Sequence, residues 1–120
     1  MDYLLSNITV ILPTKNEVVS LPYVINELNG HLPDFKCLVS DGLSQDGTPD
    51  VAKALGLKVV VSSERGVGAA FTEALKYVDT TYTLLIDCDY TYVIDEFLPL
   101  VLKDMDISNL DLVIGHRKFK

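Results

Sequence analysis

Short apolar runs alternate with helix-like segments along the whole chain, and this alternation restricts the possible folds more than any other feature. The runs with strand character are Ile8–Leu12, Phe35–Val39, Lys58–Val61, a run that ends at Leu84–Ile86, and Asp111–Ile114. Apolar residues at helical spacing lie between them, in Val18–Asn29, Pro49–Leu55, Ala69–Tyr77 and Ile94–Leu102. This regularity predicts an α/β fold with mostly parallel strands, right-handed crossovers and helices on both faces of the sheet.

Turn-forming residues are expected to bound these elements. We expect the first strand to stop at Pro13 and the first helix to close at Asn29-Gly30. The second helix should be capped by Asp46 or Thr48 and should end at Gly56. Leu84–Ile86 are interpreted as the end of a buried strand. A chain of 120 residues with 48% hydrophobic residues is long enough for one packed core, so we expect a single domain over residues 1–120.

The net charge of −7 argues against partners that need a basic protein face. Nucleic acid and anionic membrane surfaces are such partners, so we expect no binding to nucleic acid. No signal peptide and no segment of membrane-spanning length are apparent. We therefore expect a soluble, cytoplasmic protein and leave open a peripheral attachment to a membrane through a partner. Cys37 and Cys88, the two cysteines, are interpreted as small buried residues.

Two aspartates directly follow the fourth apolar run, as LLIDCDYTY over residues 84–92. Side chains two residues apart on an extended chain project to the same side, so Asp87 and Asp89 can face one point. Two carboxylates held that close repel each other unless a cation or a proton separates them. Mg²⁺ or Mn²⁺, which prefer oxygen ligands and often share them with a diphosphate, would remove that repulsion. For this short pattern alone, a solvated turn or a helix cap stays open as the alternative.

Polar clusters follow every predicted strand. Because ligands bind at the carboxyl ends of strands in open α/β sheets, these clusters together predict a binding site on one rim. Gly66 and Gly68 open the third helix, where a ligand can approach free N–H groups. The rim clusters are Thr14–Glu17, Asp41, Arg65, the pair Asp87 and Asp89, and Arg117.

The same motifs, in the same order, resemble those of family-two glycosyltransferases with the GT-A fold. ILPTKNE resembles the family's first strand with its Pro-x-x-Asn-Glu turn, and SDGLSQDGT resembles its second-strand loop. GVGAA resembles its small-residue helix start, DCDYTY its Asp-x-Asp with a following Thr-Tyr, and GHR its Gly-x-Arg. The branch most similar is that of the polyprenyl-phosphate transferases, such as dolichyl-phosphate mannose synthase. The resemblance implies a Rossmann-like nucleotide-diphospho-sugar transferase core.

The resemblance also implies roles for single residues. The nucleoside pocket would be lined by Pro13, Thr14, Glu17 and Asp41. Asp87 would lie near the ribose or diphosphate and support the metal, which Asp89 would coordinate. Arg117 would contact phosphate as a catalytic residue, while Arg65 and Gly68 are further candidates for substrate binding on the rim. The implied reaction is a metal-assisted, inverting transfer from a UDP- or GDP-sugar.

The sequence departs from the family pattern at the mouth of the site and in length. Tyr90 replaces a small residue and Val93-Ile94 replaces a proline-containing turn, which predicts a narrower mouth. Family members continue well beyond Arg117, whereas this sequence stops at Lys120. We therefore expect either a minimal donor-binding half or a second chain that completes the acceptor site, and we expect self-association through uncovered apolar surface.

The expected acceptor is a polyprenyl phosphate rather than a sugar hydroxyl. A hydroxyl needs a general base, and the nearby carboxylates of Asp95 and Glu96 are better placed to cap a helix. A phosphate monoester attacks without losing a proton to the enzyme, and Arg117 with its neighbours His116 and Lys118 supplies positive charge. The alternatives are a nucleotide-sugar-binding module without turnover, a nucleotidyltransferase and a phospho-receiver domain. A phospho-receiver domain needs an acidic pair after its first strand, and this sequence lacks that pair.

Overall fold

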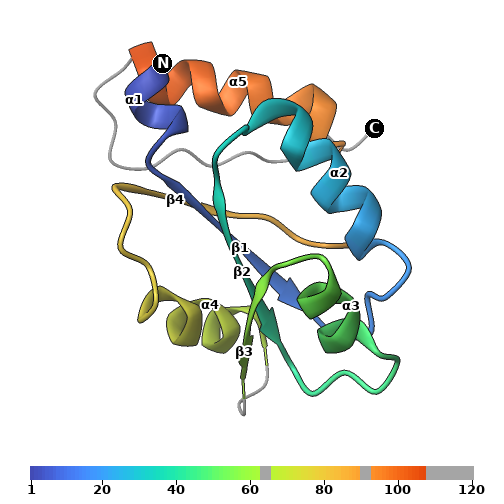
Figure 1. The fold of residues 1–120 in the computed structure, drawn as a ribbon. Coiled ribbons are helices and arrows are strands. Elements are labelled where there is room, and N and C mark those ends of the chain that lie inside the picture. Colours follow the sequence, from blue (N-terminus) through green and yellow to red (C-terminus); the bar gives the residue numbers. More distant parts are fainter. Residues whose placement is uncertain (63–65, 90–92, 108–120) are drawn as a thin grey trace, which may run out of the picture.

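The core of the structure is a sheet of four parallel strands, whose order across the sheet is β3-β2-β1-β4 (Figure 1). The computed structural model describes residues 1–62, 66–89 and 93–107. The strands are β1 at Ile8–Thr14, β2 at Lys36–Asp41, β3 at Lys58–Val61 and β4 at Tyr82–Leu85. The predicted parallel sheet is thus confirmed, and Lys58–Val61 has the predicted bounds. The predicted strand Asp111–Ile114 lies outside the described residues.

Helices cover both faces of this sheet, as predicted. They are α1 at Asp2–Leu5, α2 at Leu21–His31, α3 at Thr48–Ala54, α4 at Val67–Leu75 and α5 at Ile94–Ile107. α1, α2, α3 and α5 contribute to one apolar cluster, whereas α4 packs on the opposite face (Figure 1). No helix among the described residues is both long and apolar enough to cross a bilayer.

The central strand β1 has apolar side chains on both of its faces, because helices cover both faces of the sheet there. Val10 and Leu12 face the larger cluster with α2 and α5, and Ile11 faces α4 together with Leu38 and Ala74. A strand buried on both faces loses the polar alternation of a surface strand. This explains why residues 8–12 are apolar apart from Thr9.

The first strand continues through Pro13 to Thr14, so the prediction that it stops at the proline was wrong. Along β1, the backbone groups of successive residues point in turn toward β4 and toward β2. The carbonyl group of Ile11 accepts the N–H of Ile86, which follows β4, and the carbonyl group of Thr14 accepts the N–H of Gly42, which follows β2. Pro13 therefore faces the β4 side, where the pairing has ended at Ile11 and Leu85. A proline is tolerated there because no N–H is required.

Several predicted boundaries differ from those in the structure. α2 begins at Leu21 instead of Val18 and continues through Asn29-Gly30 to His31. β2 extends to Asp41, α4 spans Val67–Leu75, and α5 reaches Ile107 rather than Leu102. Packing of α2 on α5 and α3 extends an element that local turn propensity alone would end at Gly30.

The end of β4 is not buried as predicted. Leu85 is 43% exposed, and Tyr82, Thr83 and Leu84 are half-buried. In the described part of the chain, β4 lies at the end of the sheet and has β1 as its one neighbour. Ile86, one residue further, is buried and donates its N–H to the carbonyl of Ile11 over 3.1 Å.

Candidate functional site

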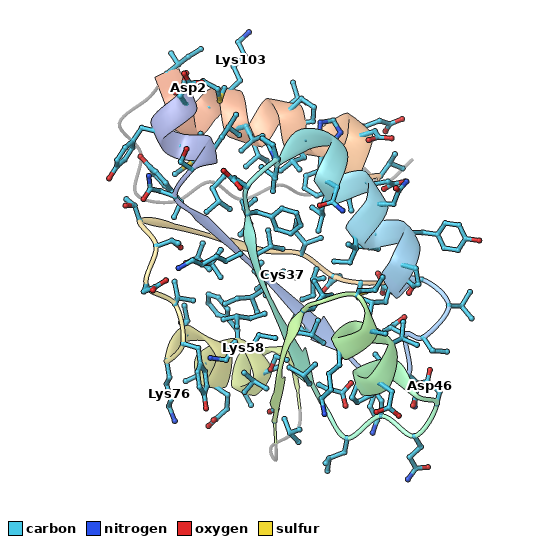
Figure 2. The ribbon with its side chains drawn as sticks, viewed as in Figure 1. Asp2, Cys37, Asp46, Lys58, Lys76 and Lys103 are labelled. Atoms are coloured by element: carbon cyan, nitrogen blue, oxygen red, sulfur yellow. The ribbon has the colours of Figure 1, made fainter. Side chains whose placement is uncertain are left out.

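The carboxyl ends of β1, β2 and β4 meet at one edge of the sheet, and the predicted polar clusters that follow them come together there. Thr14 ends β1, Asp41 ends β2, and Asp87 and Asp89 follow β4. Figure 2 shows Asp46 at this end of the molecule, far from Asp2 and Lys103 at the other. We call this edge the carboxyl rim.

Asp41 is the centre of a buried hydrogen-bond network at the rim. Its side chain is 1% exposed, yet its Oδ1 accepts from Thr14 Oγ1 at 2.7 Å and from Ser44 Oγ at 2.6 Å. Its Oδ2 accepts the backbone N–H of Ser44 at 2.8 Å. A buried carboxylate is tolerated when its oxygens are bonded in this way. Thr14 and Asp41 therefore hold the two loops in shape, and their predicted contact with a nucleoside stays a prediction.

The turn after β1 is tied to the loop after β2 by a second set of bonds. The N–H of Asn16 donates to Ser44 Oγ at 2.8 Å, and its Oδ1 accepts the N–H of Gln45 at 2.9 Å. Asn16 (φ 56°) and Leu43 (φ 62°) both lie in the left-handed region, which costs a residue with a side chain about 1 kcal/mol or more. The bonds offset this cost and leave the pair of loops preorganised.

Lys15 belongs to the same network and not to an open basic site. Its Nζ donates to the carbonyl oxygens of Gly42 at 2.8 Å and Leu43 at 3.0 Å. An ammonium group held by two carbonyls acts as a clamp between loops. It is consequently a poor candidate for neutralising a substrate diphosphate.

Asp46 joins the turn after β1 to the start of α3, in place of the predicted simple cap. Its Oδ2 accepts the N–H of Val18 at 3.1 Å and its Oδ1 accepts the N–H of Thr48 at 3.0 Å. The hydroxyl of Thr48, the first residue of α3, in turn accepts the N–H of Glu17 at 3.0 Å. The hydrogen bond from the Thr48 side chain, together with these N–H donors, lowers the pKa of Asp46.

The carboxyl group of Glu17 lies near other carboxylates of the rim. Partial burial raises the pKa of Glu17, and the negative charges of Asp89, Asp46 and Asp87 raise it further, against a hydrogen bond from Ser20 that lowers it. Like charges influence a carboxyl group in this way only when they are near it. The Ser20 hydroxyl lies 3.1 Å from Glu17 Oε2 and 2.5 Å from the backbone oxygen of Cys88, the residue between the two aspartates, so Asp87 and Asp89 lie near Glu17. That both aspartates face one point stays a prediction.

The chain between the two aspartates is anchored in the core. Cys88 is 2% exposed and packs in the larger apolar cluster, whereas Asp89 is exposed and Asp87 is half-buried. Burial raises the pKa of the Cys88 thiol to about 12 and that of Cys37 to about 12, so both are neutral. Cys88 is the predicted small buried residue, and it holds the two carboxylates at the surface on either side of it.

A divalent metal fits this arrangement only with outside ligands. Within the described ranges, no group of three His, Cys, Asp or Glu side chains is placed to hold a metal ion. Asp87 and Asp89 offer carboxylate oxygens beside other negative groups, which suits a hard cation. Its remaining ligands would come from water or from a bound diphosphate, as is usual for Mg²⁺.

The predicted roles of three further site residues, Arg65, Arg117 and Gly68, stay predictions. Arg65 and Arg117 lie outside the described residues, as do His116 and Lys118. Gly68 is the second residue of α4 and is exposed, and a Cβ at this position would meet nothing within 4 Å. Open space above Gly68 is compatible with the approach of a ligand.

Ser20 is a residue of the rim that sequence reasoning missed. Its hydroxyl lies 2.5 Å from the backbone oxygen of Cys88 and 3.1 Å from Glu17 Oε2. In the sequence, Ser20 precedes Leu21-Pro22 at the start of a helix, which is the ordinary pattern of a helix cap. No signal in that pattern indicates a partner 68 residues away.

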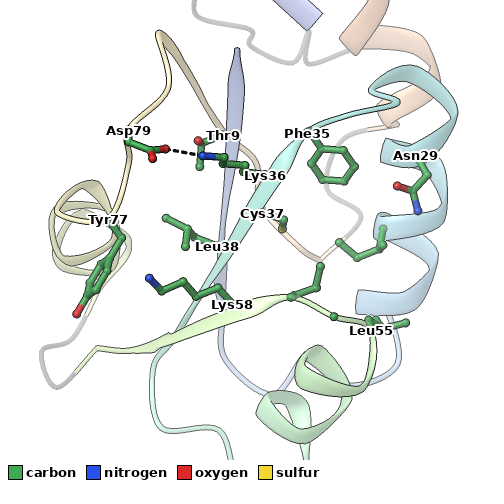
Figure 3. A pocket seen from close by; sticks show the side chains of 13 residues that line it. Thr9, Asn29, Phe35, Lys36, Cys37, Leu38, Leu55, Lys58, Tyr77 and Asp79 are labelled. Atoms are coloured by element: carbon green, nitrogen blue, oxygen red, sulfur yellow. Dashed lines mark hydrogen bonds and ion pairs between the residues drawn. The ribbon is translucent and has the colours of Figure 1, made fainter. Parts of the chain in front are cut away.

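A cavity of about 510 Å³ lies at the other end of the strands (Figure 3). Its lining includes Lys36 and Lys58, the first residues of β2 and β3, so it is separate from the carboxyl rim. Both amines already have partners: Lys36 Nζ lies 2.8 Å from Asp79 Oδ1, and Lys58 Nζ lies 4.5 Å from the centre of the Tyr77 ring. The rim, and not this cavity, carries the groups suited to chemistry.

Comparison with known proteins identifies the protein family to which these features correspond. The model of the family described as "Glycosyl transferase family 2" matches residues 9–120. Protein RfbJ of Shigella flexneri is 31% identical over 93% of this chain and 86% of its own length. The dolichyl-phosphate hexose transferase of Haloferax volcanii is 30% identical over 97% of this chain, which spans 50% of that protein.

Solved structures show the same fold. Glucosyl-3-phosphoglycerate synthase from Mycobacterium tuberculosis, in complex with Mn²⁺, UDP-glucose and phosphoglyceric acid, superposes with a TM-score of 0.70 at 25% identity. The match covers 83% of this chain and 39% of the synthase. The predicted GT-A fold is thereby confirmed.

Proposed function

Because the chain belongs to glycosyl transferase family 2, we propose that it binds a nucleoside-diphosphate sugar at the carboxyl rim for transfer of the sugar to an acceptor. The observation that carries this proposal is the place of Asp87 and Asp89 on either side of Cys88, which the Ser20 hydroxyl connects to Glu17 beside two interlocked loops. The chain spans about half of the Haloferax relative and less of the synthase, so the activity of a whole enzyme is part of the proposal.

The two interlocked loops supply the nucleoside side of the site. Pro13, Thr14, Glu17 and Asp41 line it in this proposal, with the shape set by the bonds around Asp41. Preorganised loops bind a rigid nucleoside without losing further conformational entropy. UDP and GDP are the candidate nucleotides.

The metal side is formed by Asp89, with Asp87 in support, holding Mg²⁺ or Mn²⁺. The Mn²⁺ and UDP-glucose bound by the related synthase support this assignment. When bound, the ion offsets the charge of the diphosphate and of the leaving nucleotide. Lys15 is occupied by carbonyl groups, so Arg65 and Arg117 are the proposed basic residues for phosphate.

The proposed acceptor is a polyprenyl phosphate, and transfer proceeds with inversion in one displacement. The name of the Haloferax relative, a dolichyl-phosphate hexose transferase, supports such an acceptor. A phosphate is already a dianion near neutral pH, because its second pKa is about 6, and needs no general base. Positive charge from Arg117 would offset its repulsion from the diphosphate.

Calorimetry with UDP, GDP and their sugars, each with Mn²⁺ and with EDTA, tests donor binding. We expect one nucleotide to bind more tightly with Mn²⁺, and equal affinity in EDTA would contradict the metal site. A donor-consumption assay then compares a short polyprenyl phosphate with simple sugar acceptors. Transfer to a sugar hydroxyl, or unchanged lipid-phosphate transfer in Arg117→Ala, would reject the proposed acceptor. Donor binding without consumption with any acceptor would identify a binding module without turnover.

A further inference from the structure

The hydroxyl group of Ser20 joins the nucleoside side of the rim to the metal side. It lies 2.5 Å from the backbone oxygen of Cys88, to which it donates. The hydroxyl oxygen of Ser20 also lies 3.1 Å from Oε2 of Glu17, which belongs to the turn after β1. Both neighbours are acceptors and a hydroxyl carries one proton, so Ser20 donates to one of them at a time, and the shorter distance favours the carbonyl group of Cys88.

Ser20 does not perform the ordinary task of a serine at this position. It is the N-cap residue of α2, but its side chain makes no capping hydrogen bond. Pro22 in the first turn has no N–H to donate. The hydroxyl is instead directed across the rim, to a partner 68 residues away along the chain.

The carbonyl group of Cys88, to which Ser20 donates, directly precedes Asp89 and so influences the orientation of that residue. Cys88 is fixed on one side by its buried thiol and on the other by the bond from Ser20 to its carbonyl group. That carbonyl belongs to the peptide unit that leads into Asp89. Because a peptide unit is planar, fixing its oxygen fixes its rotation, and with it the starting direction of the next residue.

The regular sheet does not hold this peptide. Pairing of β1 with β4 ends at Ile11 and Leu85, and the backbone bond from Ile86 to Ile11 follows directly. Cys88 lies two residues beyond that bond. The hydrogen bond from the Ser20 hydroxyl therefore holds the backbone at Cys88, where pairing between β1 and β4 has already ended.

We propose that Ser20 is a positioning residue for the Asp87 and Asp89 pair, aligning the metal-binding carboxylates with the nucleoside loops. This inference rests on the proposed function. It assigns to Ser20 no contact with substrate or metal. Residues that orient metal ligands through hydrogen bonds typically change metal affinity about 10–100-fold when they are removed.

Three variants test the inference by calorimetry with UDP and GDP, each measured with Mn²⁺ and with EDTA. Ser20→Ala removes the donor, and Ser20→Thr keeps a hydroxyl. Ser6→Ala is the matched control, because Ser6 donates to the backbone oxygen of Asp2 at 2.9 Å in an exposed place. The informative quantity is the ratio of nucleotide affinity with Mn²⁺ to that in EDTA.

In Ser20→Ala we expect this ratio to fall about tenfold, with the affinity in EDTA within a factor of two of the wild type. Ser20→Thr should restore most of the ratio, and Ser6→Ala should leave it unchanged. A purely structural role would instead lower both affinities together, which overturns the inference, as does an unchanged ratio in Ser20→Ala. If the wild type shows no dependence on Mn²⁺, the proposed function fails and the inference fails with it.

Discussion

The two halves of the carboxyl rim are held together in different ways. Around β1 and β2, the polar side chains bond mainly to one another and to loop backbone, with Asp41 at the centre. Beyond β4, Asp87 and Asp89 flank a buried Cys88 and add their charges to that of Glu17. In the half around β1 and β2, the protein itself supplies the hydrogen-bond partners of the polar side chains. In the half beyond β4, negative charges lie close together, which suits a cation. Similar loop polarity in a sequence can thus serve shape in one place and, in the proposed function, binding in another.

The largest expected effect is the loss of metal-dependent binding in Asp89→Asn. The substitution keeps the size of the side chain and removes its charge, so nucleotide affinity with Mn²⁺ should fall to the EDTA value. Calorimetry with and without Mn²⁺ measures this loss. Asp79→Asn is the matched control, because Asp79 is exposed and pairs with Lys36 at 2.8 Å, away from the rim. Unaltered metal dependence in Asp89→Asn would show that the two halves do not differ as described.

The second effect concerns stability and should be confined to the other half. Asp41→Asn replaces one of two oxygens that accept bonds from Thr14 and Ser44 with an NH₂ group, so at least one of these donors loses its acceptor. We expect a loss of about 2 kcal/mol in the free energy of unfolding, measured by urea denaturation. Asp89→Asn should change the same quantity far less. Equal losses in the two variants would remove the distinction between a structural and a binding half.

The smallest effect is a pH dependence that arises where the halves meet. The pKa of Glu17 is raised in the folded state, so the folded protein holds this proton more tightly than the unfolded chain does. Stability should therefore fall as pH rises from the ordinary glutamate value through the raised one. Urea denaturation across this range should show a shallower fall in Glu17→Gln than in the wild type. Identical pH profiles would mean that neither burial nor the nearby carboxylates raise the pKa of Glu17 in the folded state.

Much of the fold could be predicted because its periodic signals are strong. The apolar run of β1 and the bounds of β3 at Lys58–Val61 follow from the sequence pattern. The extension of β1 through Pro13 does not, because it depends on where the neighbouring strand ends. The exposure of Leu85 likewise depends on the place of β4 in the sheet, which apolar composition does not determine.

The position of the candidate site could be predicted from the sequence, but the contacts of its side chains could not. The carboxyl ends of parallel strands meet by topology, so Asp41, Asp87 and Asp89 could be assigned to one rim from order alone. Which carboxylate is buried by its own loop and which faces outward depends on bonds between distant segments. Ser20 was missed for the same reason, since its partner belongs to a different part of the chain.

The ties that build the rim also differ in how early a folding chain can form them. Thr14 and Asp41 are 27 residues apart, whereas Ser20 and Cys88 are 68 residues apart. Closing a longer loop costs more entropy, and distant contacts slow folding. During synthesis, the loops around Asp41 are available for pairing before the aspartate pair has been translated. We expect the nucleoside side to be in place when the metal side docks, and pulsed hydrogen exchange during refolding should protect β1 and β2 before β4.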